Sequence, residues 1–379
     1  MSRKRAAVAN QGGGLEISAE TARLGAFIEK TAGFWIKAAG VESAYLKHDL
    51  AQIPIRAPIY VTGLARAGST ILLELLAEHP DVGSHRYRDF PPVYTPVMWD
   101  WLLKRMPTQA AEPTERSHKD RIFITPDSPE AMEEAIWMRF FPDLHDPARD
   151  NSLDGATRAP AFEKFYRDHV AKILLIRDAR RYVSKGNYAI SRLAYLKRLF
   201  DDALFVVPVR DPVHHIASLI KQHRLFQAAE GADGRILDHM RRAGHFEFGL
   251  DLRPINFGHA GATARVRALW AEGEEVRGWA AYWADVYGHV LARLAADDGL
   301  RQAVKIVRFH ELCRKSERVL ADLFDHCGLA VTDQDLARWA ARLTAPSYYR
   351  PAFSERDLDV IAEETGAIAE AFGVKEAGA

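Results

Sequence analysis

The pattern of hydrophobic and polar positions predicts helices that alternate with short apolar strands. Residues 17–48 carry apolar side chains at helical spacing, and a second long helix is expected between Trp279 and Leu294. Four short runs are rich in apolar and β-branched residues, the pattern of buried strands. These runs are Ile59–Val61, Tyr182–Ser184, Leu204–Val209 and Val304–Val307. Because strands that alternate with helices form parallel sheets, we predict a three-layer α/β fold with a central parallel sheet, although Pro208 interrupts one run.

The chain is expected to form one domain. Residues 1–14 end in Gln-Gly-Gly-Gly and are predicted to be a flexible leader, so the α/β domain would span residues 15–379. Within the region around 97–175, residues 105–160 are rich in Pro, Asp and Arg and surround one expected helix, Pro129–Phe140. No linker-like composition flanks this region, and we therefore interpret it as a helical insertion in the domain.

Composition excludes several classes of protein. The 379 residues are 48 % hydrophobic, enough for a sizeable core, and 51 basic residues balance 51 acidic ones. Zero net charge argues against broad binding to nucleic acid. No apolar run approaches the roughly 20 residues of a membrane span, and the N-terminus lacks the apolar stretch of a secretory signal. Cys313 and Cys327 lack metal-ligand spacing and are expected to be thiols, which favours a cytoplasmic location.

A phosphate-binding loop follows the first predicted strand. Gly63, Gly68 and Thr70 fit the spacing of the G-x-x-x-x-G-K-[ST] loop, whose amides bind phosphate at the start of a helix. Ser69 takes the place of the lysine, and Arg66 is the cation inside the loop. The alternative is a plain strand-to-helix turn in which Ser69 or Thr70 caps the helix. The residues expected to bind an anion are Arg66, Ala67, Gly68, Ser69 and Thr70.

A second candidate site begins at the end of the strand 204–209. Asp211 and Pro212 are a favourable N-cap and first helical residue, which places Arg210 at the carboxyl end of a central strand. Ser218 lies two helical turns later and could share a phosphate with Arg210. Alternatively, Arg210 pairs with a surface carboxylate and Ser218 faces solvent. Asp211 could also hold magnesium in a triphosphatase, but its use as a cap and the missing loop lysine oppose that role.

In order and spacing, these motifs resemble those of bacterial-type sulfotransferases that use 3′-phosphoadenosine 5′-phosphosulfate (PAPS). The segments that carry the resemblance are Gly63–Thr70, Tyr182–Asn187, Val209–Ser218 and Val307–Leu312. The resemblance implies that the first loop binds the 5′-phosphosulfate and that Arg210 and Ser218 bind the 3′-phosphate. It also implies sulfuryl transfer to a hydroxyl group of a small-molecule, glycan or lipid acceptor, without a metal ion.

The resemblance further implies catalytic roles. Arg66 takes the position of the family's loop lysine, and Lys185 matches a second catalytic lysine. Cytosolic members carry a histidine base two residues further on, where this chain has Asn187. Other branches use a carboxylate after the helix that follows the loop, which points to Asp89 as the base and to His85 as its competitor.

Several alternatives stay open. Asp89 could instead be a structural partner of Arg86 or Arg88, and Lys185 could be an ordinary exposed lysine. Arg350 is a candidate ligand of the 3′-phosphate, because family members close over it with a basic C-terminal loop, but a surface arginine fits the sequence equally. Two other functions are possible. The first is an ATP-dependent phosphotransferase with the same fold. The second is a non-catalytic nucleotide-binding scaffold, which is suggested by Asn187 at the position of the histidine base.

Overall fold

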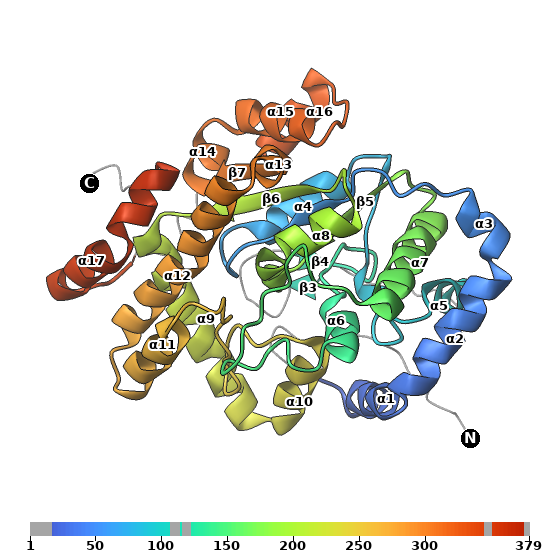
Figure 1. The fold of residues 1–379 in the computed structure, drawn as a ribbon, viewed down its shortest axis with the longest axis horizontal. Helices are drawn as coiled ribbons and strands as arrows, with labels where there is room; N and C mark the ends of the chain where they lie inside the picture. The colour runs from blue at the N-terminus through green and yellow to red at the C-terminus, as the bar shows by residue number, and fades with distance from the viewer. Residues whose placement is uncertain (1–16, 107–113, 116–122, 345–350, 375–379) are drawn as a thin grey trace.

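A parallel sheet of five strands lies at the centre of the protein (Figure 1). The computed structural model describes residues 17–106, 114–115, 123–344 and 351–374. The strand order is β2-β5-β1-β6-β7, and every neighbouring pair is parallel. The strands are β1 (Ile59–Val61), β2 (Val82–Gly83), β5 (Arg181–Lys185), β6 (Leu204–Val209) and β7 (Val304–Arg308). The predicted parallel α/β fold is confirmed, and the edge strand β2 lies outside the four runs that were predicted to be strands.

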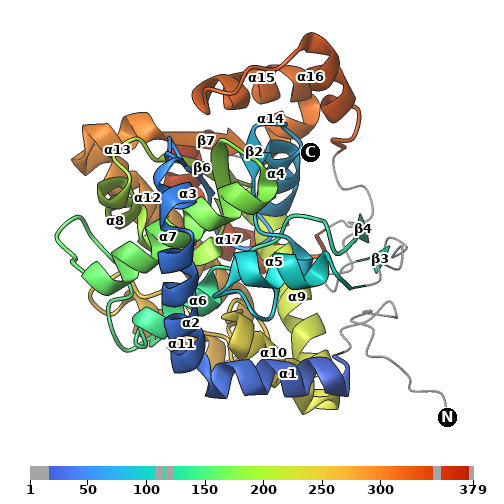
Figure 2. The same ribbon diagram turned by 90° about the vertical axis from the view of Figure 1, so that its right-hand side faces the viewer.

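Helices surround the sheet, and a small antiparallel hairpin of β3 (Thr114–Glu115) and β4 (Phe123–Ile124) lies apart from it (Figure 2). Both views place α1 against α10, and α17 packs beside α12. The helices before β5 are α1 (Ala19–Lys30), α2 (Ala32–Tyr45), α3 (Lys47–Ala51), α4 (Ser69–Ala77), η1 (Tyr87–Asp89), α5 (Pro96–Leu103), α6 (Glu134–Phe140) and α7 (Pro160–Arg177). Those after it are η2 (Asn187–Ser191), α8 (Leu193–Leu199), α9 (Pro212–Ala232), α10 (Gly234–Ala243), α11 (Ala262–Ala271), α12 (Glu275–Ala296), α13 (Asp298–Ala303), α14 (Phe309–Arg314), α15 (Ser316–His326), α16 (Asp333–Ala340) and α17 (Glu355–Phe372).

Two predicted helices differ from those observed. The helix expected over 17–48 is divided into α1, α2 and α3, with the first break at Thr31. The Thr31 hydroxyl donates to the carbonyl of Phe27 at 2.6 Å and accepts from the Trp35 indole at 3.0 Å, in addition to the backbone bonds from the amides of Thr31 and Trp35. Such bonding by a threonine side chain often bends a helix. The helix expected over 129–140 begins only at Glu134, because the backbone before it pairs with the segment that contains His85.

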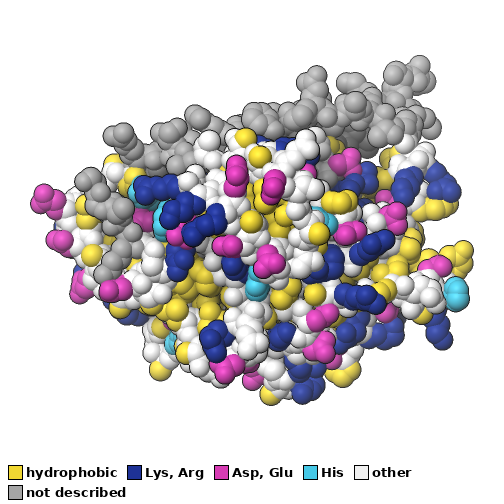
Figure 3. Space-filling view, turned by 90° about the horizontal axis from the view of Figure 1, so that it is seen from above, with side chains coloured by type: hydrophobic (Ala, Val, Ile, Leu, Met, Phe, Trp, Pro, Cys, Tyr) yellow, Lys and Arg dark blue, Asp and Glu magenta, His cyan; other side chains and the backbone are white. Residues whose placement is uncertain are grey.

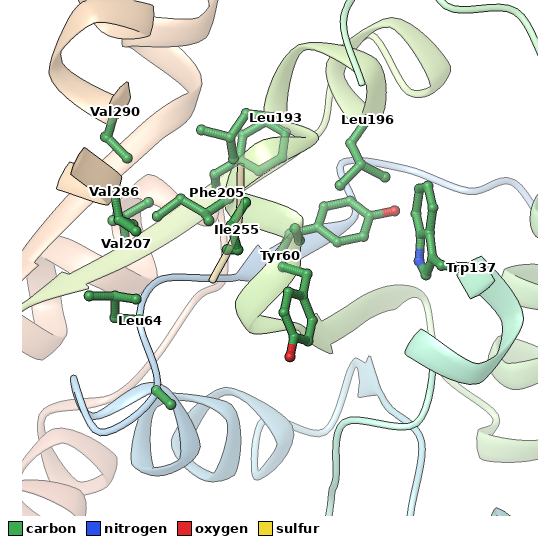
Figure 4. Packing of buried hydrophobic residues seen from close by; sticks show 14 of the residues in the cluster. Tyr60, Leu64, Trp137, Leu193, Leu196, Phe205, Val207, Ile255, Val286 and Val290 are labelled. Carbon is green, nitrogen blue, oxygen red and sulfur yellow. The ribbon is translucent and has the colours of Figure 1, made fainter. Parts of the chain in front are cut away.

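Side chains alternate between the two faces of the sheet, as a period of two requires. Ile59 and Val61 of β1 pack with the leucines of α4 and with α15 and α16. Tyr60 points to the opposite face, where it joins Phe205 and Val207 in a larger cluster formed with α7 and α12 (Figure 4). The sheet is therefore covered on both sides, as the three-layer prediction requires.

Pro208 is accommodated inside β6 because β1 is short. The ladder between β1 and β6 ends where the amide of Thr62 donates to the carbonyl of Val206 at 2.9 Å. In a parallel strand every second residue faces the same neighbour, so Pro208 faces β1 beyond its last residue. Its missing N–H removes no bond of the ladder, and its carbonyl accepts from the hydroxyl of Tyr287 at 3.0 Å.

The surface carries both signs of charge. Figure 3 shows Lys and Arg side chains interspersed with Asp and Glu, in agreement with the net charge of zero. Within the described ranges, no helix is long and apolar enough to cross a membrane.

Candidate functional site

The carboxyl ends of four parallel strands meet at one edge of the sheet. The phosphate loop follows β1, Gly186 follows β5, Arg210 follows β6 and Phe309 follows β7. The hydroxyl of Thr62 donates to the carbonyl of Gly186 at 2.7 Å and so ties the first two of these ends together. Ligands of open α/β sheets bind at this edge.

Gly68 forms the turn from the loop into α4. It is the N-cap residue and has φ +106°, a conformation that L side chains rarely adopt. A Cβ at this position would lie 2.7 Å from Cδ2 of Phe309, so the ring packs directly on the loop. Because a glycine is the cap, no side chain caps α4, contrary to the alternative in which Ser69 or Thr70 does so. The positive end of the helix therefore points at the loop.

Arg66 connects the loop to α9. It also has positive φ, at +71°, and its Nε donates to Oγ of Ser218 at 3.4 Å. The two sequence motifs, predicted to act on one donor, are thus in direct contact. Arg66 and Ser218 are both half-buried.

A buried histidine supports the loop from behind and was not found from the sequence. The indole of Trp283 donates to Nδ1 of His215 at 3.1 Å, so Nε2 carries the proton and donates to the carbonyl of Ala65 at 2.8 Å. Burial lowers the pKa of His215 to about 3, which keeps the ring neutral and its donor in place. This hydrogen bond fixes the residue that precedes Arg66.

Arg210 lies where the sequence placed it, at the end of β6. Its guanidinium carbon is 5.2 Å from the centre of the Phe309 ring, which also contacts Gly68. The predicted cap is confirmed: the Asp211 carboxylate accepts from the amide of His214 at 3.0 Å, and Pro212 is the first residue of α9. Asp211 is therefore engaged as a helix cap.

Lys185 ends β5 and is paired with a carboxylate. Its Nζ lies 3.6 Å from Oε1 of Glu130, and its side chain is 12 % exposed. The alternative of an ordinary exposed lysine does not fit this burial. Two residues later, Nδ2 of Asn187 donates to Oε1 of Glu247 at 2.8 Å. Neither Glu130 nor Glu247 was found from the sequence.

The two candidate bases, Asp89 and His85, are buried away from solvent. Asp89 forms an ion pair with Arg177 and accepts from the amide of Arg86 at 2.8 Å. Burial opposes its ionisation, but His85 and Arg177 outweigh this effect and hold the pKa of Asp89 well below its usual range. A fully ionised carboxylate held by an arginine is a weak proton acceptor. The geometry of Asp89 thus matches the structural alternative, with Arg177 as the partner.

The Nε2 atom of His85 lies 2.9 Å from Nε2 of His169, inside the same buried cluster. Arg350 lies outside the described residues, so its proposed contact with the 3′-phosphate is not placed. Within the described part of the chain, no group of three or more His, Cys, Asp or Glu side chains is arranged to hold a metal ion.

Comparisons with known proteins point to one family and one fold. A sulfotransferase family model matches residues 58–245, which contain the phosphate loop, Lys185 and the Arg210 segment. Sulfotransferase STF9 from Mycobacterium avium is 15 % identical, with 89 % of this chain and 83 % of that chain covered and a TM-score of 0.50. Sulfotransferase STF1 from Mycobacterium tuberculosis H37Rv is 18 % identical, with 92 % and 86 % covered and a TM-score of 0.45. A search of curated proteins found no match.

The likeness to STF9 shows a shared fold, and the family match covers the loop on which the site is built. The chain belongs to the sulfotransferase family.

Proposed function

We propose that the protein transfers the sulfuryl group of PAPS to a hydroxyl group of a small-molecule, glycan or lipid acceptor. The observation that carries this proposal is the contact between Arg66 in the loop and Ser218 on α9. It joins a cation at the 5′ end of the donor to a hydroxyl for its 3′ end, which suits a nucleotide with phosphate at both positions.

In this proposal the donor lies along the carboxyl edge of the sheet. The amides of residues 66–70 and the positive end of α4 bind the 5′-phosphosulfate. Arg210 and Ser218 bind the 3′-phosphate, and Arg350 is proposed to complete that subsite. Arginine is suited to this task because its planar guanidinium binds two oxygens at once.

The reaction is an in-line displacement at sulfur. The acceptor oxygen forms a bond to sulfur while the bond from sulfur to the leaving phosphate oxygen breaks, and negative charge grows on that phosphate. Arg66 and Lys185 are the proposed cations that stabilise this charge, which is larger in the transition state than in the ground state. The acceptor also loses its proton, and Asp89 was the sequence-based prediction for the residue that takes it.

Calorimetry with 3′,5′-phosphoadenosine, without metal, tests the donor site. We expect the wild-type protein to bind it and Arg210→Ala to weaken binding by about 10–100-fold, since a hydrogen bond to a charged group contributes about 1.5–3 kcal/mol. Arg235→Ala is the matched control, because Arg235 pairs with Asp233 on the exposed start of α10. Absence of binding by the wild-type protein would refute the proposal.

The same titration separates the competing functions. A phosphotransferase would bind ATP with magnesium in preference to 3′,5′-phosphoadenosine, whereas the loop without its lysine favours the reverse. A scaffold would bind 3′,5′-phosphoadenosine, yet transfer no sulfuryl group from PAPS to any acceptor, water included.

A further inference from the structure

A small cavity lies between the phosphate loop and the helices α9 and α12. Its volume is about 10 Å³, the room that one water molecule or one hydroxyl group needs. Gly63, Leu64 and Ala65 line it on the side of the loop, and Asn187 and Glu247 contribute its polar side chains. The rest of the lining is largely apolar and aromatic. It consists of Tyr188, Leu219, Ile255, Trp279 and Tyr282.

One oxygen of the Glu247 carboxylate accepts a hydrogen bond within the protein, and the other can accept one from a ligand. Oε1 accepts from Asn187, whereas Oε2 accepts no hydrogen bond from any described residue. Oε2 lies 3.3 Å from Nδ1 of His245, and the Glu247 side chain is only 14 % exposed. A largely buried carboxylate oxygen without a hydrogen bond needs a further donor, and a hydroxyl group in the cavity would supply one.

The backbone around Glu247 is fixed by side chains from other elements. The amide of Phe246 donates to the hydroxyl of Tyr188 at 2.8 Å, and the amide of Leu250 donates to Glu230 of α9. Gly249 has φ +87°, and a Cβ there would lie 2.3 Å from a carboxylate oxygen of Glu230. Glu247 therefore sits on a loop whose path is set, as a catalytic group requires.

We propose that Glu247 is the catalytic base of the acceptor site and that Asn187 is its positioning residue. This inference rests on the proposed sulfuryl transfer. While the acceptor oxygen bonds to sulfur, its proton moves to Oε2 of Glu247, and the electron pair of the broken S–O bond stays on the departing phosphate. Glu247 returns the proton to solvent, with His245 beside it. Asp89 is less suited to accept this proton because its carboxylate forms an ion pair with Arg177.

The test compares Glu247→Gln with wild type, using PAPS as donor and phenol or 4-nitrophenol as acceptor, in addition to water. Glutamine keeps the size of the side chain and can still accept from Asn187, but it cannot take a proton. We expect transfer to phenol and water to fall by about 100-fold or more, since a general base contributes about 10²–10⁴-fold. Transfer to 4-nitrophenol at slightly alkaline pH should fall much less, because its oxygen is already largely ionised. Asp251→Asn, four residues away, is the matched control, since that carboxylate pairs with Arg241 and Arg253.

Binding of 3′,5′-phosphoadenosine by each variant distinguishes a failure of the proposed base from a failure of the proposed donor site. Glu247→Gln should bind it as wild type does, which also shows that the variant is folded. Transfer to phenol within threefold of wild type would overturn the role of Glu247, and so would equal losses with both phenols. If only Asp89→Asn loses transfer, the catalytic base is Asp89 and not Glu247. Binding by the wild-type protein without any sulfuryl transfer would overturn the role of Glu247 but not the donor site, whereas no binding at all would overturn the proposed function.

Discussion

Substitution of Gly68 by alanine should damage both the stability and the donor site of this protein. The added methyl group meets two obstacles. The backbone has φ +106°, which an L side chain rarely adopts, and the new Cβ would lie 2.7 Å from the Phe309 ring. The ring in turn faces the guanidinium of Arg210, with 5.2 Å from the guanidinium carbon to the ring centre. The ring can move away only by disturbing that contact.

The two obstacles set the size of the effect. A residue forced into a sparsely populated backbone conformation costs about 1–3 kcal/mol. An overpacked contact costs typically about 1–3 kcal/mol more. We therefore expect Gly68→Ala to lower the free energy of unfolding by about 2–6 kcal/mol. The double variant Gly68→Ala with Phe309→Leu should recover part of the packing cost that alanine adds, but not the backbone cost.

Urea unfolding followed by circular dichroism measures the stability, and calorimetry with 3′,5′-phosphoadenosine measures the donor site. Gly366→Ala is the control, because Gly366 lies inside α17 with open space around its Cβ position. Alanine there should stabilise the helix by up to about 1 kcal/mol. If Gly68→Ala unfolds at the same urea concentration as wild type, neither the backbone conformation at residue 68 nor the contact with the Phe309 ring limits the side chain there.

Two further predictions concern buried ionisable side chains. Burial lowers the pKa of His215 to about 3 and that of His239 to about 4, so below about pH 6.5 the unfolded chain binds protons that the folded chain refuses. The free energy of unfolding should then fall by about 1.4 kcal/mol per pH unit for each ring, and urea midpoints that stay constant from pH 7 to pH 5 would contradict this. Arg192→Met should cost about 3–5 kcal/mol in urea unfolding, because Arg192 is 1 % exposed and its two bonds neutralise the carboxylate of Glu134. Arg235→Met, which breaks an exposed pair, should leave the midpoint nearly unchanged, and an equal loss in both variants would refute the distinction.

The sequence identified the parts of the site that depend on local pattern. The strand, loop and helix around Gly68 were predicted because strand propensity, glycine spacing and an apolar helix face lie next to one another in the chain. The cap at Asp211 followed from its place before Pro212, and this cap fixes Arg210 at the end of β6. Arg210 before the helix α9 and Ser218 two turns later, within that helix, could then be assigned to the same phosphate of one ligand.

The parts that escaped prediction depend on contacts between distant segments. His215 supports Ala65 across 150 positions, and Glu247 bonds Asn187 across 60. No local pattern marks either residue, since a lone histidine in a helix and a lone glutamate in a loop are common. Asp89 was chosen because it is near the loop helix in sequence, but nearness along the chain does not reveal that Arg177 binds it. Only the packing of the fold separates a carboxylate that serves the reaction from one that serves stability.

The proline in β6 has a consequence for how the site stays open. If residue 208 carried an N–H, that donor would point toward the stretch just after Thr62 and could extend the ladder between the two central strands. The first residues of the loop could then pair with β6 as an extended strand. That extended conformation would compete with the turn that starts at Gly63. Pro208 removes that competitor by its covalent structure, whatever the temperature or ligand. The separation of the two strands, on which the turn proposed to bind the donor depends, is thus determined by a residue of the neighbouring strand and not by the loop itself.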